Sequence, residues 1–198
     1  MRVFVVSPYH GGSHAAWAEG WARHSSHEVH LLTMDAHFWK WRMFGAPTTL
    51  ALHAERLVAE VGPPDAIVAT DMLDLPGFLG RARTSIGDPL TVLYVHEIQL
   101  RYSLAEGASE DLTYAFLNWQ SMEAADATWW NSGFHRGQVF EALPVLLGRF
   151  PDHRHLPLLD GVSARSSVMP VGVEVADLPT GPKAEPPVIL WSHRWEYD

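Results

Sequence analysis

A pair of glycines flanked by histidines is the first place in the chain where the residue types could do chemistry. The run Tyr9-His10-Gly11-Gly12-Ser13-His14 follows an apolar stretch and opens a segment with helical spacing. Paired glycines let the backbone approach a ligand closely, and the free N–H groups of a helix N-terminus can bind an anion or a sugar hydroxyl. The run lacks the GxGxxG pattern of dinucleotide sites and the lysine of the P-loop. We therefore expect a ligand-binding turn here, and a tight turn capped by Ser13 is the alternative.

The two histidines of this run raise a second possibility, which is a metal site. His10 and His14 are four residues apart, but His10 precedes the expected helix and the neighbouring sequence holds no carboxylate. Zinc sites need three or four well-placed ligands. We expect no metal at these histidines.

A histidine and a carboxylate leave the most apolar strand candidate together, in the run Tyr94-Val95-His96-Glu97-Ile98-Gln99-Leu100. Burying such groups costs free energy unless they are partnered or face a cleft. His96 and Glu97 are therefore the strongest local candidates for a functional site.

Three further sets of residues follow expected strands, and each allows two interpretations. Phe38-Trp39-Lys40-Trp41-Arg42 could stack on a base or a sugar ring, or its tryptophans could be buried. Thr70-Asp71 fits a helix cap and, less well, a substrate contact. Asn131-Ser132 fits either a helix cap or a ligand contact. A fourth set, Pro151-Asp152-His153-Arg154, is best explained as a loop salt bridge.

The elements that must position these residues alternate along the chain. Apolar, β-branched runs predict strands over 3–7, 28–32, 66–70, 90–95, 128–130 and 167–170, and helical patterns cover 13–24, 48–61, 110–125 and 133–147. Such alternation predicts parallel βαβ units and an α/β fold with a Rossmann-like, open, mainly parallel sheet. Ligands of these sheets bind beyond the carboxyl ends of the strands, which is where the candidate residues fall.

Composition narrows the function further. The 198 residues carry 14 basic and 23 acidic side chains, and the net charge of −9 argues against a surface that coats nucleic acid, although a small basic patch remains open. The chain has no cysteine and no apolar run of the ~20 residues that span a bilayer. It also shows no signal peptide, so we expect a cytoplasmic protein without a membrane partner. Ser-His-Asp order and paired-carboxylate spacing are missing, which favours a binding cleft over a nucleophile-centred site.

The C-terminal end predicts a domain boundary. Gly181-Pro182-Lys183-Ala184-Glu185-Pro186-Pro187 cannot form a helix interior or a central strand, and a short apolar run, 188–191, follows it. We expect residues 1–183 to form one domain. Residues 184–198 would then be a linker and the first strand and loop of a second domain.

Together these motifs resemble the tRNA-queuosine α-mannosyltransferase family, whose members are also known as glycosyltransferase-like domain-containing proteins. The resemblance runs in order from Phe4 to Asp198 and rests on the GGSH, HE-x-QL, PDHR and HRWE-x-D motifs, which are specific as a set. Two positions depart from the family pattern on the side expected to face the acceptor. Ile98 stands where the family usually has Asn, and Ser103 where it usually has Pro.

The resemblance implies the N-terminal domain of a GT-B glycosyltransferase, in which two Rossmann-like domains face each other across a cleft. It implies retaining transfer of mannose from GDP-mannose, the donor substrate, to queuosine in tRNA, without a metal or other cofactor. The isolated chain should be inactive, because the C-terminal domain of such enzymes holds most of the donor. A non-tRNA acceptor and a non-catalytic ligand-binding module are the alternatives.

The same resemblance implies roles for individual residues. His96 should lie nearest the reacting sugar, and Glu97 could fix the tautomer of that histidine or hold a hydroxyl group. Donor and phosphate contacts are expected from Gly11, Gly12, Ser13, His14 and Arg194, and acceptor contacts from Trp39, Trp41, Arg42, Gln99, Asn131 and Ser132.

Overall fold

The computed structural model describes residues 1–98, 100, 111–173, 181, 185–186 and 188, and within them six strands form one sheet. The strands are β1 (Arg2–His10), β2 (Glu28–Asp35), β3 (Ala66–Thr70), β4 (Leu90–Val95), β5 (Ala127–Trp130) and β6 (Ser166–Val168). Their order is β2-β1-β3-β4-β5-β6, and every neighbouring pair is parallel. The predicted α/β fold with an open, Rossmann-like parallel sheet is confirmed.

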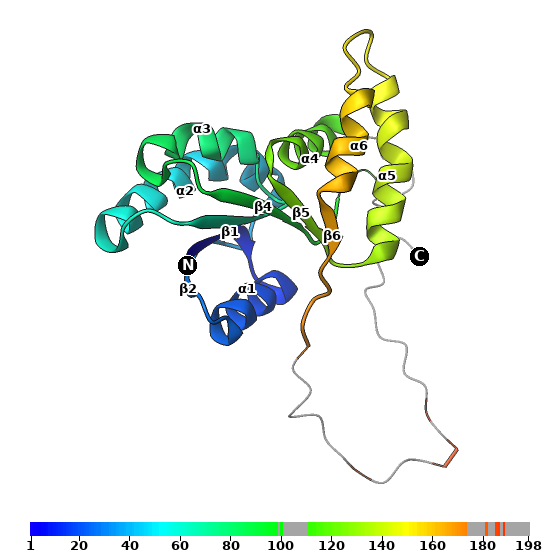
Figure 1. Ribbon diagram of the computed structural model, residues 1–198. Helices are drawn as coiled ribbons and strands as arrows, with labels where there is room; N and C mark the ends of the chain where they lie inside the picture. Colours follow the sequence, from blue (N-terminus) through cyan, green and yellow to red (C-terminus); the bar gives the residue numbers. More distant parts are fainter. Residues whose placement is uncertain (99, 101–110, 174–180, 182–184, 187, 189–198) are drawn as a thin grey trace.

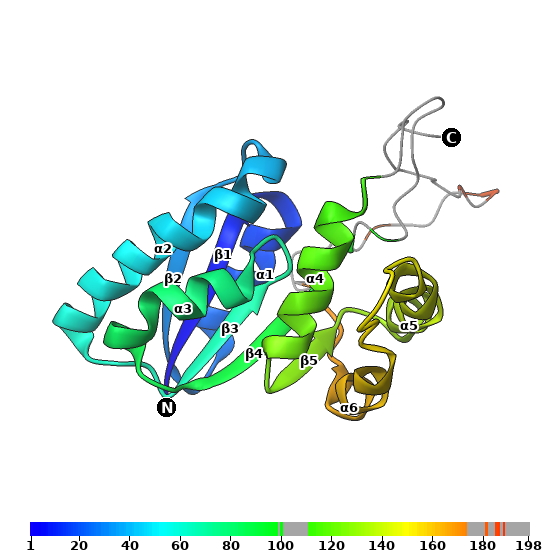
Figure 2. The ribbon, with the colours of Figure 1, turned by 90° about the horizontal axis from the view of Figure 1, so that it is seen from above.

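The helices cover the two faces of this sheet unequally. They are α1 (Gly12–His24), α2 (Trp39–Val61), α3 (Leu75–Ile86), α4 (Leu112–Ala124), α5 (Gly133–Gly148), the 3-10 helix η2 (Leu156–Leu158) and α6 (Leu159–Ala164). Figures 1 and 2 show α1 on one face, α2, α3 and α4 on the other, and α5 and α6 beside β5 and β6. The reason is that parallel strands are joined by right-handed crossovers. The chain moves from β1 to β2 toward one edge of the sheet, and then from β2 to β3 and onward toward the other edge. The helices after β2 therefore lie on the face opposite to α1.

Side chains along the strands point alternately to the two faces of the sheet, and each face has its own hydrophobic core. Phe4, Ile67 and Leu93 belong to the core beneath α2, α3 and α4. Their neighbours along the strands, such as Val68 and Val92, face Trp17 and Trp21 of α1. A parallel sheet buried on both faces explains why its strands read as continuous apolar runs.

The predicted start of one helix was wrong. α2 begins at Trp39 instead of Thr48 and contains Pro47. Proline has no N–H to donate to the carbonyl four residues before it, which usually ends a helical pattern. Here the carbonyl of Met43 accepts a hydrogen bond from Asp74 N at 3.2 Å instead, so the helix passes through Pro47 without leaving that carbonyl unpaired.

Three helices lie outside the predicted helical ranges: α3, η2 and α6. α3 carries two glycines, Gly77 and Gly80, which weaken a helical pattern. The Asp74 side chain caps it by accepting a hydrogen bond from Gly77 N at 3.0 Å. Among the described residues, no helix combines the length and the apolar character that crossing a membrane requires.

Candidate functional site

Two histidines from distant parts of the chain meet at the carboxyl edge of the sheet. His14 lies in the first turns of α1 and His96 directly follows β4. Their ring centroids are 4.2 Å apart with planes inclined by 33°. Trp17 and Tyr94 also contact the His96 ring, with centroid distances of 5.0 and 4.8 Å. The glycine run and the His-Glu run of the sequence are thus brought together, and both rings are largely buried.

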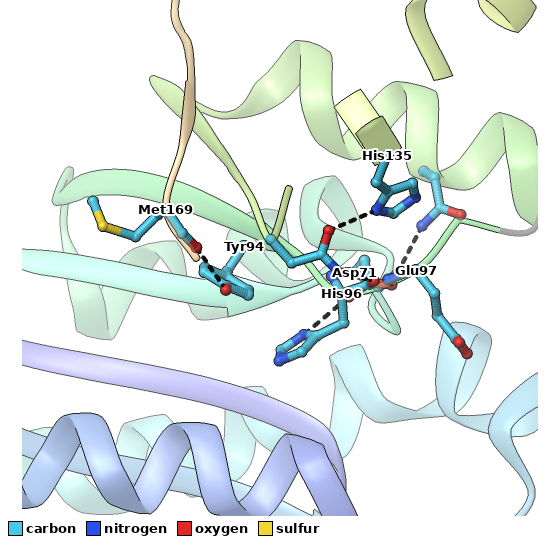
Figure 3. A network of polar contacts seen from close by, with 8 residues as sticks. Asp71, Tyr94, His96, Glu97, His135 and Met169 are labelled. Carbon is cyan, nitrogen blue, oxygen red and sulfur yellow. Dashed lines mark hydrogen bonds and ion pairs between the residues drawn. The ribbon is translucent and has the colours of Figure 1, made fainter. Parts of the chain in front are cut away.

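A buried carboxylate holds the His96 segment in place (Figure 3). Asp71, which follows β3, is 2% exposed and accepts hydrogen bonds from His96 N at 3.0 Å and from Glu97 N at 3.1 Å. Its Oδ1 also lies 3.4 Å from His96 Nδ1, close enough for a charge interaction. Asn118 Nδ2 donates to the Asp71 carbonyl at 2.7 Å. Asp71 therefore orients both the backbone and the imidazole of His96.

This geometry corrects two expectations. Asp71 does not cap a helix, because Asp74 caps α3. The carboxylate beside the His96 imidazole belongs to Asp71 and not to Glu97, whose side chain points away from that ring in Figure 3.

Electrostatics in this cluster favour a charged Asp71 and a neutral His14. Burial alone would raise the pKa of Asp71, but the hydrogen bond and charge of His96 and the charge of His14 hold it below its usual value. Burial lowers the pKa of His14, and the neighbouring His96 lowers it further.

The other side of the His96 segment is built by α5 and the residues before it. Asn131 Nδ2 donates to the His96 carbonyl at 2.7 Å, and Asn131 Oδ1 lies 3.1 Å from His135 Nδ1. Ser132 caps α5 by accepting from His135 N at 3.1 Å. Burial lowers the pKa of His135. The sequence analysis did not single out this histidine, although it lies three residues after the predicted site residue Ser132.

These residues surround a pocket of about 260 Å³ at the ends of β4 and β5. Its lining is His96, Glu97, Ile98, Asn131, Ser132, Phe134, His135 and Gln138. Four of the predicted site residues therefore share one pocket: His96, Glu97, Asn131 and Ser132. A larger, mainly apolar hollow of about 580 Å³ lies beside α1, next to Trp17, Trp21 and Trp129. The smaller pocket is the better candidate for chemistry, because it collects the convergent polar groups.

The glycine run combines a packing role with an open backbone. Gly11, not Ser13, is the N-cap of α1, and a Cβ on it would lie 2.5 Å from Ala36 Cβ. Gly12 has φ +52, and a Cβ there would meet open space in the described part of the chain. His10 Nε2, at the end of β1, lies 3.2 Å from Glu19 Oε1. Glu19 belongs to α1, so the helix brings a carboxylate to this histidine.

The aromatic run at the start of α2 is split between core and surface. Trp39 packs against Tyr114 with ring centroids 4.9 Å apart, in a cluster that also includes Tyr9 and Met72. Trp41 is 63% exposed. Arg42 donates to the Asp35 carbonyl at 3.0 and 3.2 Å, which gives its guanidinium a local structural contact.

The loop after α5 makes local contacts of the kind expected from its sequence. His153 Nε2 lies 4.0 Å from Asp152 Oδ2, with both side chains exposed, and Arg154 Nε donates to the Phe150 carbonyl at 2.8 Å. Trp119 Nε1 donates to His155 Nδ1 at 3.3 Å, which ties the loop to α4.

Two predicted site residues, Gln99 and Arg194, lie outside the described residues, as do Ser103 and most of the 184–198 segment. Within the ranges that the structure does describe, no three His, Asp or Glu side chains are grouped closely enough to hold a metal ion.

Comparison with known proteins identifies the family to which the chain belongs. The family model described as "tRNA-queuosine alpha-mannosyltransferase N-terminal" matches residues 2–173. The chain is also similar to a tRNA-queuosine alpha-mannosyltransferase of Drosophila melanogaster, with 26% identity over 212 residues. That alignment covers 100% of this chain but 54% of the relative, so the chain spans about half the length of the protein it matches. Since the family model covers most of the sequence, including every candidate residue before the C-terminal segment, the chain belongs to the tRNA-queuosine alpha-mannosyltransferase N-terminal family.

Proposed function

We propose that this chain forms the acceptor side of a retaining GT-B glycosyltransferase that transfers mannose from GDP-mannose to queuosine in tRNA. The observation that carries the proposal is the pocket at the ends of β4 and β5, held by Asp71, in a chain of this family. The Drosophila relative is named as a tRNA-queuosine alpha-mannosyltransferase. The proposed activity is that of a full-length protein, because this chain spans about half the length of that relative.

The chemistry requires a preorganised polar environment. As the bond between the sugar and the diphosphate breaks, positive charge grows on the anomeric carbon and negative charge on the departing diphosphate. Donors that are already oriented stabilise such charge without reorganising during the reaction. The contacts of Asp71 and Asn131 with the His96 backbone supply that rigidity.

In this proposal His96 and Glu97 act at the reacting groups. His96 orients the acceptor hydroxyl or donates a hydrogen bond to the sugar. The open backbone at Gly12, with Gly11, Ser13 and His14, forms one wall of the donor site, and Arg194 binds the diphosphate. Acceptor contacts come from Gln99, Asn131, Ser132 and the run from Trp39 to Arg42. No bound cofactor takes part.

The test uses the full-length protein, GDP-mannose with a labelled sugar, and tRNA with and without queuosine. We expect label transfer only to the queuosine-containing tRNA, and its loss in His96→Ala. The matched control is His27→Ala, which removes an exposed histidine in the turn between α1 and β2. Wild-type turnover in His96→Ala would overturn the catalytic role.

Two outcomes would favour the alternatives. Transfer to a small metabolite or glycan, but not to tRNA, would keep the chemistry and change the acceptor. Tight GDP-mannose binding by residues 1–198 alone, measured by calorimetry, would contradict the proposed division between donor and acceptor sides. Such binding without turnover in the full-length protein would point to a ligand-binding module.

A further inference from the structure

We propose that Phe38 and Trp41 form a platform on which unpaired RNA bases stack, beside the nucleoside that is modified. This inference rests on the proposed function, because it names how the same site would hold its RNA acceptor. It assigns a surface at the start of α2 and one partner, a single-stranded segment of RNA.

Phe38 is an unfavourable residue for the fold at its position. Its backbone lies in the left-handed region, with φ 51 and ψ 54, and its side chain is 80% exposed. A bulky residue with positive φ is strained, and a phenyl ring cannot cap the helix as Ser, Thr, Asp or Asn would. Glycine or asparagine would serve the fold better, so the exposed ring points to a role in binding.

The Trp41 indole lies against its own helix, over Gly45. A Cβ on Gly45 would lie 2.5 Å from Trp41 Cε2 and 2.9 Å from its Nε1, so the indole occupies the space that any other residue would fill. Trp41 is nevertheless 63% exposed, so much of the residue stays open to solvent while part of the indole lies over Gly45. An exposed indole that packs on its own helix offers an aromatic surface on which a base can stack.

The platform is connected to the pocket through packed side chains. The first turns of α2 and α4 lie together at the carboxyl edge of the sheet (Figure 2), where Trp39 packs against Tyr114. Tyr9 belongs to the same cluster and contacts the His14 ring with centroids 5.8 Å apart. A base on Phe38 or Trp41 would therefore lie at the same edge of the sheet as His96.

The charge of the chain favours unpaired bases over a duplex as the partner of this platform. The chain carries a net charge of −9, which disfavours a long phosphate backbone on its surface. Lys40 Nζ is 5.6 Å from the Trp39 ring centroid and 5.7 Å from that of Tyr114, whereas the nearby Arg42 donates to the Asp35 carbonyl. Stacking on aromatic side chains with few cations beside them suits a few unpaired bases and does not suit a duplex.

The test measures binding of the 198-residue chain to an RNA hairpin with unpaired loop bases, by fluorescence anisotropy without any sugar donor. Phe38→Ala and Trp41→Ala should each weaken binding by about 5-fold to about 150-fold, the range for losing one stacked base. Leu52→Ala, which truncates another exposed apolar residue of α2, should leave binding unchanged. The salt dependence should be shallow, and Lys40→Ala should reduce its slope by about 0.7, the value for one phosphate of a single strand.

Two further variants separate binding from folding. Phe38→Gly removes the backbone strain, so its melting temperature should stay equal or rise while RNA binding weakens. Gly45→Ala keeps the indole but displaces it from the helix, and it should weaken binding without loss of stability. Unchanged hairpin binding in all platform variants would overturn the inference, and so would equal binding of a blunt duplex. Loss of mannosyl transfer to queuosine with intact, platform-dependent hairpin binding would instead refute only the proposed reaction.

Discussion

The imidazole rings of His14 and His96 lie 4.2 Å apart between their centroids with planes inclined by 33°, one from α1 and the other from the end of β4. Asp71 lies beside His96 as the buried negative charge. This relationship joins the glycine run to the His-Glu run, and it makes the site sensitive to proton concentration.

Acid should destabilise the fold through His14. Its pKa is lowered in the folded state by burial and by His96, so the unfolded chain binds its proton more readily. Stability from this group is therefore complete above the unfolded value of about 6.5 and falls as the pH drops through the lower folded value. His135, whose pKa is also lowered by burial, contributes in the same direction. Urea unfolding between about pH 8 and about pH 5 measures the effect, since histidines titrate there.

The matched variant is His14→Phe, which keeps a ring against His96 but cannot titrate. We expect a smaller loss of stability on acidification in this variant, whereas His27→Ala should retain the full loss. If stability falls with pH in His14→Phe as it does in the original chain, the His14–His96 pair is not the source of the acid sensitivity.

Asp71→Asn should destabilise the domain although it barely changes the side-chain volume. The amide can accept a hydrogen bond with one oxygen only, so one of the N–H groups of His96 and Glu97 loses its acceptor in a buried site. An unpaired buried donor costs about 1–3 kcal/mol. Thermal and urea unfolding of the two proteins give the difference.

Asp74→Asn is the control for this substitution, three residues further along. Asp74 caps α3, and asparagine caps a helix about as well as aspartate. We expect a change within about 0.5 kcal/mol, because the capping hydrogen bond is kept. If Asp71→Asn and Asp74→Asn lower the free energy of unfolding equally, the hydrogen bonds of Asp71 contribute no more to stability than a helix cap does.

Gly11→Ala should destabilise the domain by overpacking. The added methyl group would lie 2.5 Å from Ala36 Cβ, at the end of β2. Forcing an extra carbon into a packed contact costs about 1–3 kcal/mol. Ala36→Gly removes the opposing methyl group, so the double variant should recover most of that loss. Gly12→Ala should also lose stability, but because alanine disfavours the positive φ of this position. Ala36→Gly should therefore not restore the stability of Gly12→Ala.

The sheet could be predicted from the sequence because its strands are continuous apolar runs, and the position of the pocket followed from the carboxyl ends of those strands. Asp71 was misassigned because a Thr-Asp pair after a strand looks like a helix cap. Its true contacts are with His96 and Glu97, on the neighbouring strand's loop, and no local pattern reports them. The start of α2 was missed for a related reason: the bond from Asp74 to the Met43 carbonyl that permits Pro47 is a tertiary contact.

Tyr94 should resist ionisation until unusually alkaline pH. Burial raises the pKa of its hydroxyl, and the negative charge of Asp71 raises it further, to about 12. The folded value exceeds the unfolded value of about 10, so the stability from this group is present below about pH 10 and is lost as the pH rises through about 12. The hydroxyl also donates to the Met169 carbonyl at 2.8 Å, a bond that ionisation would break. Ultraviolet difference titration of the chain and of Tyr94→Phe isolates this one of the five tyrosines. In Asp71→Asn the same titration should shift toward lower pH, because the negative charge that disfavours the phenolate is gone; an unshifted curve would mean that burial alone sets the value.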